Sequence, residues 1–158
     1  MIDSAVRLTE ELGARSLTIA TAESCTGGRL AARLTDIPGV SAVFLGAIVA
    51  YHNRVKTALL GVPEEILDAH GAVSPQTAEA MATGAMGRFS SDLGVGITGV
   101  AGPGGGSVEK PVGLVYISVA DARGSKTGRF DFAGDRASVR NQAVDAALDL
   151  VLARLSAP

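Results

Sequence analysis

The chain has 158 residues, of which 47% are hydrophobic and 19% are charged, and its formal net charge is −2. This size and composition predict one packed globular domain that needs no disulfide or metal to hold its core, and they exclude a disordered chain. Lys and Arg residues are scattered singly, and four Phe and two Tyr residues are the only phenyl and phenol rings, which argues against a nucleic-acid partner.

The sequence also bears on location and partners. One Cys cannot form an internal disulfide, and the first residues lack the charged and apolar regions of an export signal. No apolar run has the length of a membrane span. We therefore expect a cytoplasmic protein with no membrane partner. The apolar content leaves room for a buried interface in a homo-oligomer.

The first half of the chain predicts alternating helices and strands. Hydrophobic spacing, glycines and prolines predict a helix over 3–12, a strand over 16–22, a helix over 24–35, a strand over 42–51 and a helix from 52 to about 61. Gly13 is expected to end the first helix. In the second helix, Leu30 and Leu34 are spaced i,i+4 on one face.

The second half continues with a short helical turn over 63–71 and a helix capped by Ser74 that runs to about residue 89. It then predicts a strand over 93–99, an irregular Gly- and Pro-rich segment over 100–113, a hairpin over 114–132 that turns near 121–124, and a long helix capped by Asp135. Helices that alternate with strands predict a single-domain α/β/α sandwich with a mixed β-sheet over residues 1–158.

Two segments follow predicted strands: "AESCTGG" at 22–28 and "GITGVAGPGGGS" at 96–107. Ligands of α/β proteins collect where strand ends meet loops and helix N-termini, because unsatisfied N–H groups point there. If the two strands are neighbours in the sheet, both loops line one crevice.

Ser24 is a candidate nucleophile, although a hydroxyl at this place could equally cap the following helix. Gly27 and Gly28 would let the backbone approach a ligand and turn N–H groups toward it, as an oxyanion hole requires. Cys25 is the rival nucleophile. A single Cys in an apolar setting is more often inert packing.

A serine nucleophile needs a base, and two sets of side chains qualify. His52 and His70 are the only imidazoles, and His70 precedes a Gly as a residue at a helix C-terminus does. Tyr51 and Lys56 form the second set, because a lysine kept neutral by desolvation can deprotonate a serine. Spacing alone leaves the choice between His52 and Lys56 open.

The remaining sequence patterns give weaker evidence for a binding site. "GVGITG" at 94–99 fits a dinucleotide fingerprint, but its glycines lie inside a predicted strand instead of opening a helix. The glycine-rich loop after it could cradle a phosphate or a carboxylate through its N–H groups. Arg136 and Arg140 lie one turn apart and could offer two guanidiniums to a phosphate, although a solvated helix face explains them equally well. No residue spacing suggests a metal site.

Five ordered segments resemble one family: "TAESCTGG", "AYHNRVK" followed by "LLGV", "HGAVS", "GITGVAGPGGGSVEKPVGLVY" and "FAGDRASVR". Together they are similar to the CinA C-terminal domain family, the nicotinamide-nucleotide amidases also called PncC, from about Leu17 to the last helix. The resemblance implies hydrolysis of nicotinamide mononucleotide to nicotinate mononucleotide and ammonia in pyridine-nucleotide salvage, with no metal and no other cofactor. It is to the stand-alone form, without the larger N-terminal domain of full-length CinA proteins.

The resemblance also implies roles for residues. Ser24 would be the nucleophile, and Tyr51 and Lys56 would form the base and proton relay. Contacts to the oxyanion and the substrate are expected from Cys25, Thr26, Gly27, Gly28, Thr98, Gly99, Gly102, Gly104, Gly105, Gly106 and Ser107, and phosphate contacts from Lys110, Arg136 and Arg140.

In one position the sequence departs from the family, since His52 stands where the family usually has Ser. This departure leaves open a second hypothesis, a nucleotide-binding or regulatory module without turnover. A Cys25 amidase is the third.

Overall fold

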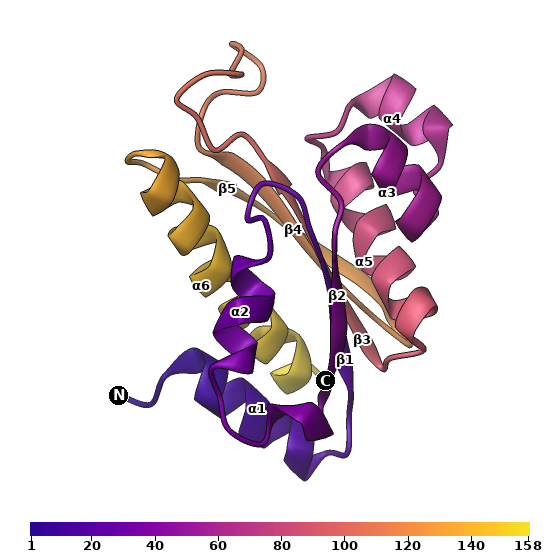
Figure 1. The fold of residues 1–158 in the computed structure, drawn as a ribbon, viewed down its shortest axis with the longest axis vertical. Coiled ribbons are helices and arrows are strands. Elements are labelled where there is room, and N and C mark those ends of the chain that lie inside the picture. Colours follow the sequence, from indigo (N-terminus) through magenta and orange to yellow (C-terminus); the bar gives the residue numbers. More distant parts are fainter.

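The sheet has five strands in the spatial order β2-β1-β3-β4-β5 (Figure 1). In this computed structural model, which describes residues 1–158, the strands are β1 (Ile19–Glu23), β2 (Phe44–Val49), β3 (Leu93–Gly99), β4 (Leu114–Asp121) and β5 (Gly124–Asp131). Strand β1 is parallel to β2 and β3, whereas β4 is antiparallel to β3 and β5. The predicted mixed sheet and its hairpin are confirmed.

Helices cover both faces of the sheet, so the predicted α/β/α sandwich is confirmed (Figure 1). One layer contains α1 (Ser4–Ala14), α2 (Arg29–Thr35) and α6 (Arg136–Ser156), and the other contains α3 (Asn53–Leu60), α4 (Glu64–His70) and α5 (Pro75–Phe89). A short 3-10 helix, η1, spans Val40–Ala42. None of the helices has a stretch long and apolar enough to cross a membrane.

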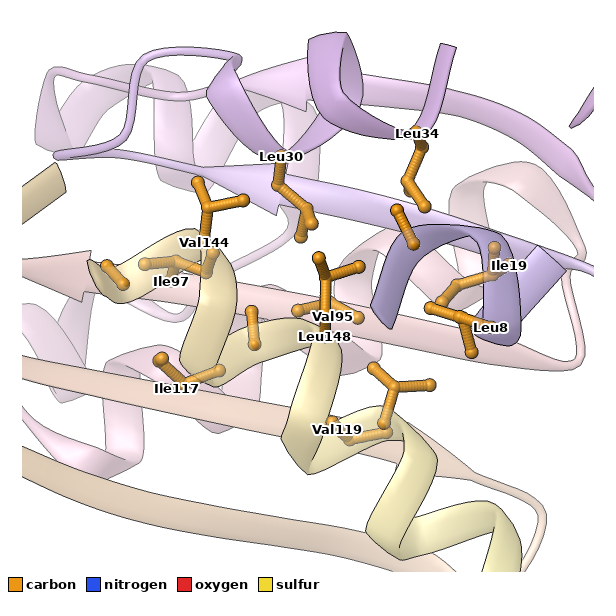
Figure 2. Close-up of a cluster of buried hydrophobic side chains, with 14 of the residues drawn as sticks. Leu8, Ile19, Leu30, Leu34, Val95, Ile97, Ile117, Val119, Val144 and Leu148 are labelled. Atoms are coloured by element: carbon orange, nitrogen blue, oxygen red, sulfur yellow. The ribbon is translucent and has the colours of Figure 1, made fainter. Parts of the chain in front are cut away.

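The larger hydrophobic core lies between the sheet and the layer of α1, α2 and α6 (Figure 2). Leucines of α1 and α2 point toward the strands, and α6 contributes residues from successive turns along its buried face. The labelled members are Leu8, Leu30 and Leu34 from α1 and α2, Ile19, Val95, Ile97, Ile117 and Val119 from the strands, and Val144 and Leu148 from α6. This packing fixes the start of α2 and of α6 against the sheet.

Two glycines of "GVGITG", Gly94 and Gly96, have a packing role on the opposite face of the sheet. A Cβ at Gly96 would lie 2.3 Å from the carbonyl oxygen of Ala78 and 2.6 Å from the amide nitrogen of Ala82, both in α5. A Cβ at Gly94 would lie 2.1 Å from the carbonyl oxygen of Ala82. Helix α5 therefore packs directly on the backbone of β3, which explains a fingerprint-like spacing inside a strand.

Gly96→Ala is expected to lower the free energy of unfolding by about 2 kcal/mol, because the added methyl group overpacks the contact between β3 and α5. Urea unfolding measures the change. Gly87→Ala is the matched control, since it lies in α5 with nothing within 4 Å of the new Cβ. There we expect a gain of up to about 1 kcal/mol from helix propensity. Equal effects of the two substitutions would contradict this account.

Two predicted helix boundaries are wrong. Helix α1 continues through Gly13 to Ala14, and the left-handed position after it is taken by Ser16 at φ 55°. Helix α2 begins at Arg29 instead of residue 24, since Gly27 and Gly28 have φ of 60° and 99°, which a right-handed helix does not accommodate. Residues 24–28 therefore form a turn between β1 and α2, which we call the serine loop.

Candidate active site

The serine loop and the glycine-rich loop over 100–113 lie at the same end of the sheet (Figure 1). Strands β1 and β3 are parallel neighbours, with Glu23 opposite Ile97 in the register. The amide nitrogen of Ser24 donates to the carbonyl oxygen of Ile97 at 3.0 Å. The predicted condition for a shared crevice, adjacent strands, is therefore met.

Lys56 is the basic side chain next to Ser24. Its Nζ lies 3.1 Å from Ser24 Oγ and donates a hydrogen bond to it. Ser24 is 8% exposed and Lys56 is 1% exposed, so the pair is shielded from solvent. Lys56 comes from the first turns of α3, directly after β2. The strand order places α3 and the serine loop side by side, although 32 residues separate the pair in sequence.

The two histidines have other positions. His52 is the N-cap of α3, where its Nδ1 accepts a hydrogen bond from the amide of Arg54 at 3.1 Å. His70 is the last residue of α4, as predicted from the Gly that follows it. Neither imidazole makes a hydrogen bond with Ser24, whose hydroxyl is bonded to Lys56. Among the candidates for the base, the geometry therefore favours Lys56.

Burial lowers the pKa of Lys56 below its ordinary value, because the charged ammonium loses its hydration. Its Nζ makes a second hydrogen bond, to the main-chain carbonyl oxygen of Tyr51 at 3.0 Å. When Lys56 is neutral, this bond uses one of its N–H groups, and the contact with Ser24 can reverse so that the serine hydroxyl donates to the lone pair of Nζ. The arrangement can accept the proton of the serine hydroxyl.

Tyr51 contacts Lys56 through its main-chain carbonyl group and not through its phenol. The side chain is 63% exposed, and its hydroxyl accepts a hydrogen bond from Arg136 Nη2 at 3.3 Å. The phenol makes no hydrogen bond with Ser24 or Lys56. The proton relay that the resemblance implies for Tyr51 thus has no direct path between these three side chains in this structure.

Glu23 is the buried residue that the sequence analysis missed. Its carboxylate accepts hydrogen bonds from the amides of Leu30 at 2.9 Å and Ala31 at 3.0 Å, and so caps the start of α2. A carboxylate suits this position because it meets the positive end of the helix dipole. Glu23 takes the capping role that had been considered for Ser24, which leaves the Ser24 hydroxyl to Lys56.

Glu23→Ala is expected to lower the free energy of unfolding by about 2 kcal/mol or more, because it leaves two amide groups at the start of α2 unsatisfied. Thermal or urea unfolding measures the loss. Glu11→Ala is the control, since that carboxylate pairs with Arg15 on the surface and its removal should change stability by less than about 0.5 kcal/mol. An equal loss in both variants would contradict the capping role.

The serine loop presents free amide groups. The amide of Gly27 donates to the carbonyl oxygen of Ser24 at 3.0 Å, which closes the turn. The amides of Cys25, Thr26 and Gly28 donate to no oxygen of the chain. Unpaired N–H groups beside a nucleophile are the donors that an oxyanion requires.

Cys25 is buried, and burial raises the pKa of its thiol to about 11. The thiolate, not the thiol, is the nucleophilic form. At neutral pH the sulfur atom is therefore protonated and unreactive, which disfavours the hypothesis of a Cys25 amidase.

The glycine-rich loop is attached to two helices. Arg136 Nη1 donates to the carbonyl oxygen of Gly102 at 2.8 Å, and Lys110 Nζ donates to the carbonyl oxygen of His70 at 2.6 Å. Lys110 thus lies at the C-terminus of α4, where its charge complements the helix dipole. Thr98 is buried at the end of β3 and donates to the carbonyl oxygen of Ala72 at 2.6 Å.

The predicted substrate-binding residues fall into two groups. The residues of the serine loop lie next to Ser24 and are held by Arg140, whereas Arg136 contacts the glycine-rich loop and the phenol of Tyr51. Gly99 and Gly102 lie at the base of the glycine-rich loop, whereas its outer part is exposed and makes no contact with Ser24 or Lys56; the exposed residues are Gly104, Gly105, Gly106 and Ser107.

A cavity of about 640 Å³ lies at the opposite end of the sheet, between the start of β3 and the end of β4, and is lined by neither Ser24 nor Lys56. The candidate site is defined by the buried Ser24–Lys56 pair, which lies away from this cavity. The structure has no group of three or more His, Cys, Asp or Glu side chains placed to hold a metal ion.

One protein-family model matches nearly the whole chain. Residues 2–155 match the CinA C-terminal domain family. The chain belongs to this family. A CinA-like protein of Desulfotalea psychrophila is 48% identical over 137 residues, which are 87% of this chain and 33% of that protein. A CinA-like protein of Synechococcus sp. (strain CC9902) is 51% identical over 148 residues, 92% of this chain and 35% of that protein.

Solved CinA structures share the whole fold. The competence/damage inducible protein CihA of Agrobacterium tumefaciens superposes with a TM-score of 0.94 at 42% identity, and covers 98% of this chain and 94% of its own. A CinA superfamily protein of Klebsiella pneumoniae gives 0.93 at 34% identity, with coverage of 97% and 96%. The chain spans about a third of the length of the curated CinA-like relatives, but nearly all of these solved chains.

Proposed function

We propose that this protein hydrolyses the carboxamide of nicotinamide mononucleotide to nicotinate mononucleotide and ammonia. The observation that carries the proposal is the buried contact of 3.1 Å between Lys56 Nζ and Ser24 Oγ. A serine paired with a desolvated amine, beside free amide groups, is suited to acyl transfer. The identity of the substrate comes from the family resemblance of the motifs that carry these residues.

The reaction proceeds in two halves. Neutral Lys56 takes the proton of Ser24, and Oγ attacks the carboxamide carbon while amides of the serine loop hold the oxyanion. The C–N bond then breaks, protonated Lys56 gives its proton to the departing nitrogen, and ammonia leaves an acyl-enzyme. Water attacks the ester, Lys56 accepts its proton and returns it to Ser24 Oγ, and nicotinate mononucleotide is released.

The 5′-phosphate of the substrate has Arg136 as its best-placed partner. The guanidinium already bridges the glycine-rich loop and the Tyr51 phenol, through Gly102 O and Tyr51 Oη. Both acceptors are neutral. If an anion bound between the loop and α6, Arg136 would gain a stronger, charge-assisted hydrogen bond in their place. Lys110, in contrast, is engaged at the end of α4.

The hypothesis of a module without turnover depended on His52. In the structure His52 caps α3 through Nδ1, a role that Ser also fills well at helix starts. The substitution is therefore a change of one cap for another, and it gives no reason to expect a loss of catalysis.

The test is ammonia release from nicotinamide mononucleotide by the purified protein, with nicotinate mononucleotide identified as the second product. Nicotinamide riboside, which lacks the phosphate, is the matched control and should react with a much higher KM. A protein that releases no ammonia but melts at a higher temperature with the nucleotide would be a binding module instead.

A further inference from the structure

Arg140 holds the serine loop by two of its carbonyl groups. Arg140 Nε donates to the carbonyl oxygen of Cys25 at 2.9 Å, and Nη2 donates to that of Thr26 at 3.2 Å. The residue lies in the second turn of α6, 115 positions from Cys25 along the chain. The fork of the guanidinium therefore spans two successive peptide groups next to Ser24.

The geometry of the peptide group turns this contact into a constraint on the amides. In a trans peptide the C=O of one residue and the N–H of the next point in opposite directions. With the Cys25 carbonyl directed at Arg140, the amide of Thr26 points away from α6. The Ser24 carbonyl is held by the amide of Gly27, so the amide of Cys25 points away from that bond.

Gly27 provides a second, independent observation. A Cβ at this position would lie 2.8 Å from Arg140 Nη2, so the guanidinium occupies the space that any other residue would fill. The backbone there has φ 60°, which also favours glycine. The absence of a side chain at Gly27 and the placement of Arg140 thus depend on each other.

We infer that Arg140 is a positioning residue for the oxyanion site: it fixes the peptide groups of the serine loop so that the amides of Cys25 and Thr26 are the oxyanion donors. The inference rests on the proposed function for the nature of the site. It replaces the role of phosphate contact expected for Arg140 from the sequence. The charge also polarises the peptide group that joins Cys25 to Thr26, which strengthens the Thr26 amide as a donor.

Arg140→Met is expected to lower kcat for nicotinamide mononucleotide about 100-fold with KM changed less than about threefold, because oxyanion donors act in the transition state. Arg140→Lys should not recover the loss, since an ammonium lacks the planar fork that reaches both carbonyls. Added methylguanidinium should restore part of kcat in Arg140→Ala and leave the wild type unchanged.

A second measurement does not depend on the nucleotide. An alkyl fluorophosphonate phosphonylates a reactive serine: Ser24 Oγ bonds to phosphorus, the P–F bond breaks, fluoride leaves, and Lys56 takes the serine proton. The same amides stabilise the phosphonyl oxygen, so labelling of Arg140→Met should slow about as much as kcat falls. Arg15→Met is the control, because that guanidinium also donates to a main-chain carbonyl, Leu155 O at 2.8 Å, at the far end of the sheet.

The outcomes separate the two proposals. A rise in KM with kcat and labelling unchanged would overturn the inference and return Arg140 to the phosphate. If the wild type is labelled at Ser24 but releases no ammonia, the proposed substrate fails while labelling still tests Arg140. If the wild type is not labelled, the assignment of Ser24 as the nucleophile and the inference about Arg140 are both overturned. If Arg140→Met does not fold, Gly27→Ala tests the same contact with Arg140 retained, and unchanged labelling there would overturn it.

Discussion

Ser24→Ala is expected to lower kcat for nicotinamide mononucleotide by about 10⁴-fold or more, because no other group near Lys56 can form the acyl intermediate. Ser24 is 8% exposed and bonded to Lys56 Nζ, which keeps its second partner, the Tyr51 carbonyl, in the variant. The fold should therefore persist. Ammonia release measures the loss, and a nucleotide-dependent rise in melting temperature shows that the substrate still binds.

Cys25→Ala is the matched control for this substitution, since it removes the neighbouring nucleophilic atom. Burial raises the pKa of that thiol to about 11, so its loss should leave kcat within about threefold. Retained activity in Ser24→Ala together with its loss in Cys25→Ala would identify the sulfur atom as the nucleophile and refute the serine scheme.

Lys56→Met is expected to abolish ammonia release and, at neutral pH, to raise the free energy of unfolding by about 1 kcal/mol. Burial lowers the pKa of Lys56 in the folded protein, whereas the unfolded chain has the ordinary value of 10.5. Between these two pKa values the unfolded state binds more protons, so wild-type stability rises with pH across that window. At a pH below both pKa values Lys56 is charged in the folded and the unfolded state, so the full free-energy cost of burying its ammonium group remains. A methionine of similar shape removes that cost.

Urea unfolding of wild type and Lys56→Met from pH 6 to 10 measures this effect. The advantage of the variant should shrink as the pH approaches 10.5, and wild-type kcat/KM should rise with pH through the lowered pKa of Lys56. Lys126→Met, on the exposed strand β5, is the control and should show neither trend. A variant less stable than wild type at neutral pH would mean that the fold stabilises the charged ammonium, so that the pKa of Lys56 is not lowered and Lys56 is not the base.

Elements with local signals could be predicted from the sequence. Helix α5 begins where Ser74 accepts from the amide of Thr77, and α6 begins where Asp135 accepts from that of Ser138, so each start depends on residues three apart. The hairpin of β4 and β5 likewise depends on its own turn and alternation. These predictions were confirmed because the stabilising contacts lie within a few residues of the boundary.

The site itself needed contacts between distant residues. The start of α2 depends on Glu23, whose carboxylate bonds to amides seven and eight residues later, across two glycines. A Glu at a strand end before Gly-Gly and a helix is the signal that could have identified it. The choice of Lys56 over His52 depends on the placement of α3 beside the serine loop, and the Arg140 contact joins residues 115 positions apart. No local pattern encodes these distances.

The contacts of α6 with the serine loop set an order for assembly during synthesis. Ser24 and Lys56 are synthesised well before α6, but Arg136 and Arg140 reach the glycine-rich loop and the serine loop only after α6 itself has been synthesised. A nascent chain that already contains its nucleophile and base therefore lacks the support of its amide donors. Hydrolytic competence should appear late in translation, together with the docking of the final helix, and not gradually as the chain grows.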